Sequence, residues 1–226
     1  MDTMLNVKEL CYSYPDGDSR RIIYDHADVS FEKGKFYALT GDSGSGKTTF
    51  LYVIAGLDKS YEGEVSLHDK DINEIGLTKY RRNHVAMIYQ NFNLIPYLSA
   101  VENIEVALDI TDNKVDRSRA AILKILDSVG INGKKARLRA SVLSGGEQQR
   151  VAIARALATG SEVLIADEPT GNLDVHASDQ VISIFRSLAH ENGKCIIMVT
   201  HNQRLAAEAD EWYEIDQEKK QIVRHE

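Results

Sequence analysis

The segment that most constrains the fold is Gly41-Asp-Ser-Gly-Ser-Gly-Lys47-Thr48, which matches the pattern G-x-x-x-x-G-K-[ST]. It follows an apolar run at residues 35–40 that predicts a strand, and a helical pattern begins at Lys47. Glycines let such a loop turn tightly and point backbone N–H groups at phosphate oxygens, while the helix N-terminus adds positive charge. The segment therefore predicts a phosphate-binding loop within an α/β fold.

This loop supplies most of the nucleotide-binding residues that we expect. The Lys47 ammonium can reach the β- and γ-phosphates, and the Thr48 hydroxyl can bind Mg²⁺. The chain has no Asn-Lys-x-Asp segment, which disfavours a GTPase that recognises guanine. We expect contacts with a nucleoside triphosphate from the whole run: Gly41, Asp42, Ser43, Gly44, Ser45, Gly46, Lys47, Thr48 and Thr49.

Two further apolar runs end in residues suited to hydrolysis. They are Val163–Asp167, followed by Glu168, and Cys195–Val199, followed shortly by His201. Each run is too short for a helix and too apolar for a half-exposed strand, so we expect two buried parallel strands joined by a helix over residues 178–191. Because ligands sit at the carboxyl ends of parallel strands, we assign Asp167 to Mg²⁺, Glu168 to the general base, and His201 to the γ-phosphate and attacking water.

A second anion site is predicted where Leu143-Ser-Gly-Gly-Glu-Gln-Gln-Arg150 opens a helix that runs to about residue 158. A single compact domain cannot easily bring two helix N-termini, the one near Lys47 and the one near Ser144, to the same γ-phosphate. We therefore expect this site to complete the nucleotide pocket of a second copy, related by a two-fold axis. The alternative, an ordinary capped helix, does not explain the paired glycines. The residues concerned are Ser144, Gly145, Gly146 and Glu147.

Composition narrows the class of protein. The 226 residues carry a formal net charge of −7, which argues against a nucleic-acid partner because that binding needs a basic face. The longest apolar runs have four or five residues, far below the roughly 20 that a membrane helix needs. The two cysteines form no disulfide framework or metal-ligand spacing, and the N-terminus shows no signal peptide, so we expect a cytoplasmic protein.

These motifs occur in the order found in ATP-binding-cassette (ABC) ATPases, which the chain resembles over nearly its whole length. The resemblance implies one domain, residues 1–226, with a RecA-like P-loop NTPase core of the α/β class. It also implies an N-terminal antiparallel β subdomain and a helical subdomain inserted at about residues 91–158. The helical spacing of apolar residues between about 100 and 157 agrees with such an insertion.

The resemblance also assigns residues that the motifs alone do not. Gln90 resembles the glutamine that reaches Mg²⁺ and senses the membrane partner, and Leu173-Asp174 resembles the D-loop. Tyr14 resembles the aromatic residue that stacks on adenine, with Tyr12 as a second candidate. ATP and Mg²⁺ are the implied cofactors, and the run from Ser144 resembles the signature motif that contacts the partner's ATP.

The run Glu168-Pro-Thr-Gly-Asn-Leu-Asp174 is similar to a subgroup that includes lipoprotein-release, macrolide-export, antimicrobial-peptide-resistance and cell-division ATPases. It implies a homodimer, peripheral on the inner face of the cell membrane, that powers separate permease subunits exporting or extracting peptide, lipoprotein or drug. The alternative is a cell-division-type ATPase that gates a partner without transport. A DNA-repair or translation ATPase is disfavoured by the net charge and the single cassette.

Four apolar residues after Gln90 would either form a groove for a helix of the permease or pack inside the helical block. They are Phe92, Leu94, Ile95 and Tyr97.

Overall fold

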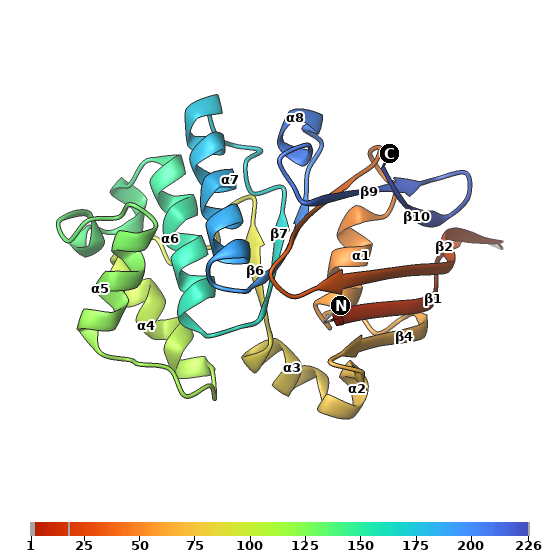
Figure 1. The fold of residues 1–226 in the computed structure, drawn as a ribbon, viewed down its shortest axis with the longest axis horizontal. Helices are drawn as coiled ribbons and strands as arrows, with labels where there is room; N and C mark the ends of the chain where they lie inside the picture. Colours follow the sequence, from red (N-terminus) through yellow and green to blue (C-terminus); the bar gives the residue numbers. More distant parts are fainter. Residues whose placement is uncertain (1–2, 18, 226) are drawn as a thin grey trace.

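Two β-sheets and a block of helices make up the computed structural model, which describes residues 3–17 and 19–225 (Figure 1). The strands are β1 (Thr3–Asp16), β2 (Ser19–Glu32), β3 (Phe36–Thr40), β4 (Glu62–Leu67), β5 (Lys70–Asp71), β6 (Val85–Tyr89), β7 (Val163–Asp167), β8 (Cys195–Val199), β9 (Glu211–Asp216) and β10 (Gln221–Arg224). The helices are α1 (Lys47–Ile54), α2 (Ile72–Ile75), α3 (Leu77–Asn83), α4 (Ala100–Ile110), α5 (Arg119–Ser128), α6 (Gly145–Ala158), α7 (Val175–His190) and α8 (Gln203–Ala206).

The larger sheet has the order β10-β9-β3-β8-β7-β6, and its strands run parallel except for β10. The predicted buried strands β7 and β8 are parallel neighbours, and α7 is the crossover between them. This helix begins three residues before the predicted Ser178, because the Asp174 carboxylate accepts the Ala177 N–H at 2.8 Å and caps its first turn. The sequence from Trp212 to Val223 predicts a small terminal hairpin, and β9 and β10 form it.

The smaller sheet is antiparallel and has the order β2-β1-β4-β5. The sequence predicts a short strand at residues 27–31, but β2 begins at Ser19 and spans 14 residues. Its first three residues are polar and exposed, and the apolar run Ile22-Ile23-Tyr24 that follows does not alternate with polar residues, so cross-strand pairing with β1 holds this part in place. This pairing sets Arg21 opposite Tyr14.

Helices α1 and α6 cover opposite faces of the six-stranded sheet. Phe50 and Leu51 of α1 belong to the core that contains Val163 and Ile165 of β7, together with the smaller sheet. Helix α6 packs in a second core with the alternate β7 residues, among them Leu164. Since successive side chains of a strand point to opposite faces, the two cores lie on opposite sides of β7. The N-termini of α1 and α6 are therefore separated by the sheet, as Figure 1 also shows.

Helices α4, α5 and α6 stand together between β6 and β7 in the chain (Figure 1). Within the predicted helical block at 91–158, the first helix begins only at Ala100. Ser99 caps α4 through a reciprocal pair of hydrogen bonds with Glu102, which fixes the start of the helix. The division of the chain into one domain with an inserted helical subdomain remains a prediction.

The non-helical stretch before α4 is held by Asn103, which is 2% exposed. Its side chain accepts the Ile95 N–H at 2.7 Å and donates to the Ile95 carbonyl at 3.1 Å and the Ser99 carbonyl at 3.0 Å.

Asn103→Ala is expected to lower the free energy of unfolding by about 1–3 kcal/mol, because buried backbone groups lose their partners. Urea unfolding measures this change. Asp109→Ala, on the exposed face of the same helix, is the control, and an equal loss in both variants would contradict the account.

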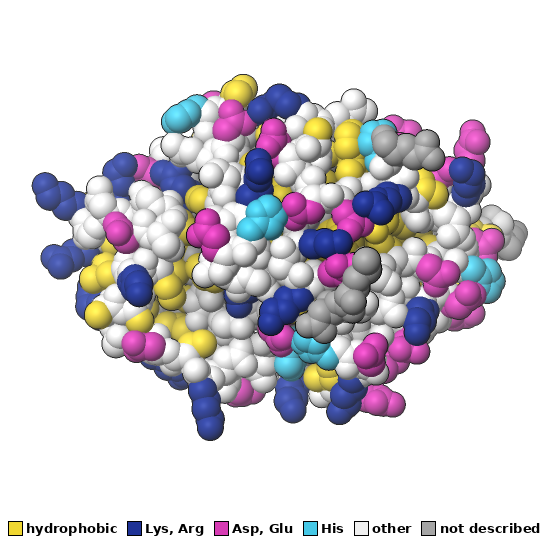
Figure 2. All heavy atoms as spheres, in the orientation of Figure 1, with side chains coloured by type: hydrophobic (Ala, Val, Ile, Leu, Met, Phe, Trp, Pro, Cys, Tyr) yellow, Lys and Arg dark blue, Asp and Glu magenta, His cyan; other side chains and the backbone are white. Residues whose placement is uncertain are grey.

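No helix within the described ranges combines the length and apolarity needed to cross a bilayer. On the face shown in Figure 2, acidic and basic side chains are interspersed rather than gathered by sign. That face therefore offers no continuous basic surface.

Candidate nucleotide-binding and hydrolysis site

The predicted motifs meet where the parallel strands end. Strand β3 lies beside β8 and β8 beside β7, so the segments that follow all three strands share one edge of the sheet. A hollow of about 350 Å³ opens there. Its lining residues are Tyr14, Arg21, Ile23, Ser43, Gly44, Gly46, Lys47, Thr48, Thr49, Glu168 and His201.

The loop before α1 has a backbone that only glycine can adopt at Gly46. Its φ is 105°, and a Cβ atom there would lie 2.4 Å from Ile23 Cγ2. The Tyr24 hydroxyl donates to the Gly46 carbonyl at 3.0 Å and ties the loop to the smaller sheet. The close contact with β2 therefore fixes both the loop and the direction of the helix that follows.

Lys47 is a buried cation, and no carboxylate among the described residues forms an ion pair with it. Its Nζ donates to the Gly41 carbonyl at 2.8 Å and the Asp42 carbonyl at 2.7 Å. Burial lowers the pKa of Lys47, and the negative charges of Glu168, Asp42 and Asp167 oppose this effect. A polyanion in the hollow would stabilise the charged form further. The geometry therefore favours a phosphate chain beside this ammonium.

Ser45 gives a second sign that the loop is shaped for a ligand. Its hydroxyl is buried and has no hydrogen-bond partner among the residues that the structure describes. Buried polar atoms without partners are uncommon in folded proteins. Asp42, in contrast, is exposed and does not line the hollow, so only its backbone carbonyl takes part through Lys47.

Glu168 and His201 form a pair at the ends of neighbouring strands. His201 Nε2 lies 2.9 Å from Glu168 Oε1, and the Glu168 N–H donates to the Val199 carbonyl at 3.1 Å. Glu168 has a φ of 45°, a left-handed conformation that a residue of this type rarely adopts. The turn thereby directs its carboxylate into the hollow, as a general base requires.

Of the predicted metal ligands, Thr48 lines the hollow, whereas Asp167 does not but is close enough for the Lys47 charge to act on it. Burial raises the pKa of Asp167, as does the adjacent Glu168 charge, while Lys47 lowers it. A divalent cation would favour the ionised carboxylate. Carboxylate and hydroxyl oxygens are ligands that Mg²⁺ accepts, so this donor set fits the ion.

The structure distinguishes the two tyrosines proposed for adenine and places Gln90 outside the hollow. Tyr14 lines the hollow, is 44% exposed and shares a 2.8 Å hydrogen bond with the Thr49 hydroxyl. Tyr12 is only 5% exposed and donates to Asp58 at 2.6 Å, so Tyr14 is the residue available to adenine. Gln90 does not line the hollow. Its side-chain amide nitrogen instead lies 3.5 Å from Asn172 Oδ1.

The signature residues lie at the N-terminus of α6 and none of them lines the hollow. Ser144 and Glu147 form a capping box, and Glu147 also pairs with Lys135, which lowers the pKa of the Glu147 carboxyl. Gly146 has a packing role that the sequence did not suggest, since a Cβ there would lie 2.9 Å from Ala177 Cβ on α7. Gly145 has no such close contact.

Arg21 is a site residue that the sequence analysis missed. It lines the hollow and donates to the Gly44 carbonyl at 3.4 Å. Two adjacent arginines in a polar run carry no signal that singles out Arg21, but its pairing with Tyr14 across the hairpin would have placed it.

Arg21→Gln is expected to raise the Kd for ATP about 2- to 5-fold, the range for an exposed charge pair, with a smaller effect at high salt. Fluorescent-nucleotide titration measures the change. Arg20→Gln, one residue away and outside the hollow, is the matched control. Equal affinities for the Arg21 variant and the unaltered chain would remove Arg21 from the site.

This fold and this site define a P-loop nucleotide-binding protein with a hydrolytic centre. A family model described as ABC transporter matches residues 24–171, and the chain belongs to that family as an ATP-binding ATPase. Its α/β class and P-loop NTPase core are thereby confirmed.

Three relatives illustrate the likeness. The chain is 41% identical over 208 residues to the ABC transporter ATP-binding protein YclH of Bacillus subtilis, covering 92% of this chain and 91% of YclH. It is 38% identical to the macrolide export ATP-binding/permease protein MacB of Mannheimia succiniciproducens, covering 94% of this chain but 33% of MacB. A dimeric structure of MJ0796, a cassette of Methanocaldococcus jannaschii, matches 97% of this chain and 96% of its own, with 33% identity and a TM-score of 0.84. MJ0796 also has a dimeric post-hydrolysis structure with ADP and Pi, with a TM-score of 0.82.

Proposed function

We propose that two copies of this chain close around two ATP molecules and thereby drive a membrane transporter. The observation that carries the proposal is the separation of α1 and α6 by the sheet. Each copy has a phosphate loop on one side and an anion-binding helix end that its own hollow does not use. A two-fold arrangement lets the signature residues of each copy complete the other's site. The dimeric MJ0796 cassettes support this arrangement.

Residues of one copy bind and orient ATP. The loop from Gly41 to Thr48 holds the phosphates, Lys47 neutralises charge on the β- and γ-phosphates, and Tyr14 stacks on adenine. Ser144 and the amide groups of Gly145 and Gly146 approach the γ-phosphate from the partner. Because these donors arrive only on closure, the binding energy of ATP is used to bring the two copies together.

Glu168 carries out the proton transfer of hydrolysis. Its carboxylate takes a proton from a water molecule that attacks the γ-phosphorus, and the bond from phosphorus to the ADP oxygen breaks. His201 holds this carboxylate in place and contacts the γ-phosphate. Thr48 would hold Mg²⁺ together with Asp167 and Gln90, and the last two would have to move toward the hollow because neither lines it. The ion supplies positive charge that stabilises the transferring phosphoryl group. Release of phosphate then removes the contacts that keep the dimer closed.

The permease contact is proposed for a groove beside α4. A hollow of about 260 Å³ is lined there mainly by apolar residues of β6 and α4, among them Met87, Ala107 and Ile110, together with Arg81 and Arg82 of α3. In the nearby stretch after Gln90, Leu94 packs on the helical core, whereas Tyr97 is 70% exposed and free to contact a partner. An apolar helix of a membrane subunit fits such a groove.

Ile110→Glu is expected to leave the ATPase activity of the isolated chain unchanged but to reduce its recovery with permease-containing membranes at least about 10-fold, because a charge would be buried in the contact. Ile110 is 59% exposed, so the variant folds normally. Co-sedimentation with membranes measures the effect. Leu138→Glu, at an exposed apolar residue outside the groove, should sediment as before. Unchanged sedimentation of Ile110→Glu would place the contact elsewhere.

We infer that the chain works at the inner face of the cell membrane and serves export or extraction of a peptide, lipoprotein or drug. The likeness to MacB, named for macrolide export, supports this direction. The test is to reconstitute the chain with the permease encoded by a neighbouring open reading frame and to measure ATP-dependent movement of substrate. ATP turnover that depends on the permease without any substrate movement would favour a gating role.

A further inference from the structure

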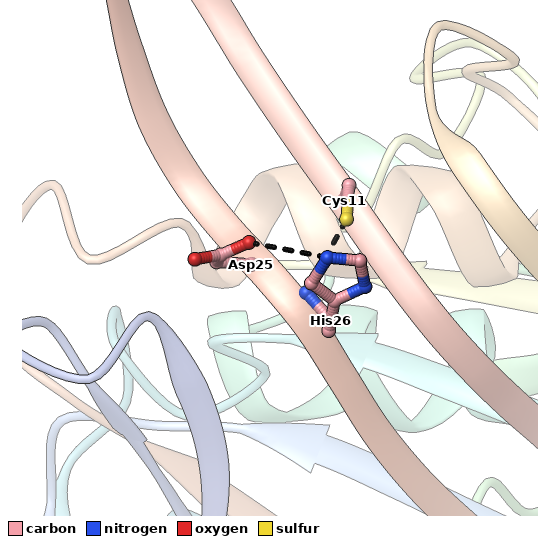
Figure 3. A group of neighbouring side chains, drawn as sticks. All are labelled: Cys11, Asp25 and His26. Carbon is pink, nitrogen blue, oxygen red and sulfur yellow. Dashed lines mark hydrogen bonds and ion pairs between the residues drawn. The ribbon is translucent and has the colours of Figure 1, made fainter.

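A cluster of potential metal ligands lies on the outer part of the smaller sheet, away from the nucleotide hollow. The β1–β2 pairing joins Leu10 to Ala27 and then Tyr12 to Tyr24, so Cys11 alone faces two residues, Asp25 and His26. His26 has a φ of 51° in this bulge. A regular strand would direct neighbouring side chains to opposite faces, whereas the bulge lets both approach Cys11. Figure 3 shows the three side chains together.

The distances suit a zinc ion. One ligand atom each from Cys11, Asp25 and His26 lies within 4.8 Å of the others, and Asp25 Oδ1 is 3.7 Å from His26 Nε2. Zinc binds nitrogen and oxygen at about 2.0–2.2 Å, so tetrahedral geometry sets such a pair about 3.4 Å apart. Small rotations of these largely exposed side chains would close the difference.

A second carboxylate orients the imidazole. Glu9 Oε2 lies 2.7 Å from His26 Nδ1, so that nitrogen donates its hydrogen and the lone pair of Nε2 is directed toward Asp25. This is the arrangement by which carboxylates fix zinc-binding histidines. Glu9 is itself held in a left-handed conformation, with a φ of 52°, where its N–H donates to Asp28 Oδ1 at 2.8 Å.

The backbone beneath the cluster is clamped by the C-terminal hairpin. The Asp25 N–H donates to the Lys220 carbonyl at 3.1 Å, and the Gln221 side chain donates to the carbonyls of Asp25 and His26. The His26 N–H donates to Cys11 Sγ at 3.3 Å and sets the thiol beside the ring. The cluster is therefore built on a fixed bulge.

We propose that Cys11, Asp25 and His26 bind one Zn²⁺ ion, with water in the fourth position and Glu9 as the group that orients His26. A sulfur, a nitrogen and an oxygen donor favour zinc over Mg²⁺, which prefers oxygen ligands. The other cysteine, Cys195, is buried in β8, where burial raises its pKa, so it cannot serve as an alternative ligand. The bound ion would join β1 to β2 beside Tyr24, whose hydroxyl contacts the phosphate loop.

The test is calorimetric titration of the whole chain, free of nucleotide, with Zn²⁺, and an optical titration with Co²⁺. The unaltered chain should bind one ion and show a sulfur-to-cobalt charge-transfer band. Cys11→Ser should abolish the band, Asp25→Asn and His26→Gln should each weaken binding at least about 10-fold, and Glu9→Gln should weaken it by roughly 10- to 100-fold.

The matched control is His68→Gln. His68 Nε2 lies 2.8 Å from the Glu162 carboxylate, much as His26 Nδ1 lies 2.7 Å from that of Glu9, but neither cysteine belongs to the His68 group. This variant should bind Zn²⁺ like the unaltered chain. The proposal is overturned if the unaltered chain binds no stoichiometric Zn²⁺, or if Cys11→Ser or His26→Gln binds it equally well. Circular dichroism of each variant shows whether the fold is retained.

Discussion

Glu168→Gln is expected to lower the rate of ATP hydrolysis at least about 100-fold and to leave the affinity for ATP within a few-fold. The amide keeps the shape of the side chain but cannot take a proton from water, and a general base commonly contributes a factor of 10² to 10⁴. The position of Glu168 beside His201, with its carboxylate in the hollow, is the reason for assigning this role to it. Phosphate release measures turnover, and equilibrium dialysis measures binding.

The chain offers a close control for this variant. Glu162 precedes β7, at the opposite end of the strand from Glu168, and also contacts histidines, with Oε2 2.8 Å from His68 Nε2. Glu162→Gln should therefore hydrolyse ATP at nearly the normal rate. A Glu168→Gln protein that retained a tenth or more of normal turnover would show that another group activates the water.

Lys47→Met is expected to raise the Kd for ATP about 100-fold, because charge-assisted hydrogen bonds to the phosphates are worth about 1.5–3 kcal/mol each. Within residues 3–17 and 19–225 the ammonium is held by two backbone carbonyls and no side chain, so its charge remains available to the nucleotide. Methionine has a similar length and removes the charge. Fluorescent-nucleotide titration measures the Kd, and turnover at saturating ATP should also fall.

Lys194→Met is the control for Lys47→Met. It shows whether a weaker affinity for ATP comes from losing contacts with the phosphates or from losing any partly buried lysine. Lys194 likewise donates to backbone carbonyls, with a bond of 2.7 Å to Ser161, and burial likewise lowers its pKa. It lies just before β8, at the end of the sheet opposite the hollow. Normal ATP affinity in Lys194→Met and weak affinity in Lys47→Met support the assignment. Similar affinities in the two variants would contradict it.

Much of the site could be predicted because its motifs join local structure to chemistry. The loop at Gly41–Thr48 has a residue pattern tied to one backbone shape, and the apolar runs before Asp167 and His201 are recognisable as buried strands. The crossover helix predicts that the strands ending at Asp167 and Val199 are parallel, so the meeting of these two ends could be inferred without coordinates, whereas the place of β3 beside β8 comes from the structure.

The remaining features depend on contacts between distant residues. Arg21 reaches the hollow only because a long hairpin pairs it with Tyr14, and the Ile95 N–H finds its partner in the Asn103 side chain, eight residues further along the chain. The grouping of Cys11 with Asp25 and His26 depends on a bulge that shifts the strand register. Sequence periodicity gives no sign of such a shift.

The structure also alters the interpretation of the signature segment. Its paired glycines predict more than an ordinary capped helix, yet Gly146 is required where α6 approaches Ala177 of α7, and Ser144 does cap the helix. Two other features favour a second copy. A Cβ atom at Gly145 would meet no close packing contact, and the sheet separates this helix end from the hollow of the same chain.

The mass of Glu168→Gln in solution, measured by light scattering after gel filtration, tests the central claim most directly. Without nucleotide the protein should have the 25.2 kDa mass of one chain, and with ATP it should have twice that mass, because bound ATP is no longer hydrolysed and keeps the two copies closed. Adding Ser144→Arg should prevent the change by placing a large cation where the partner's site must close. A protein that binds ATP and remains at 25.2 kDa would contradict the shared-site account.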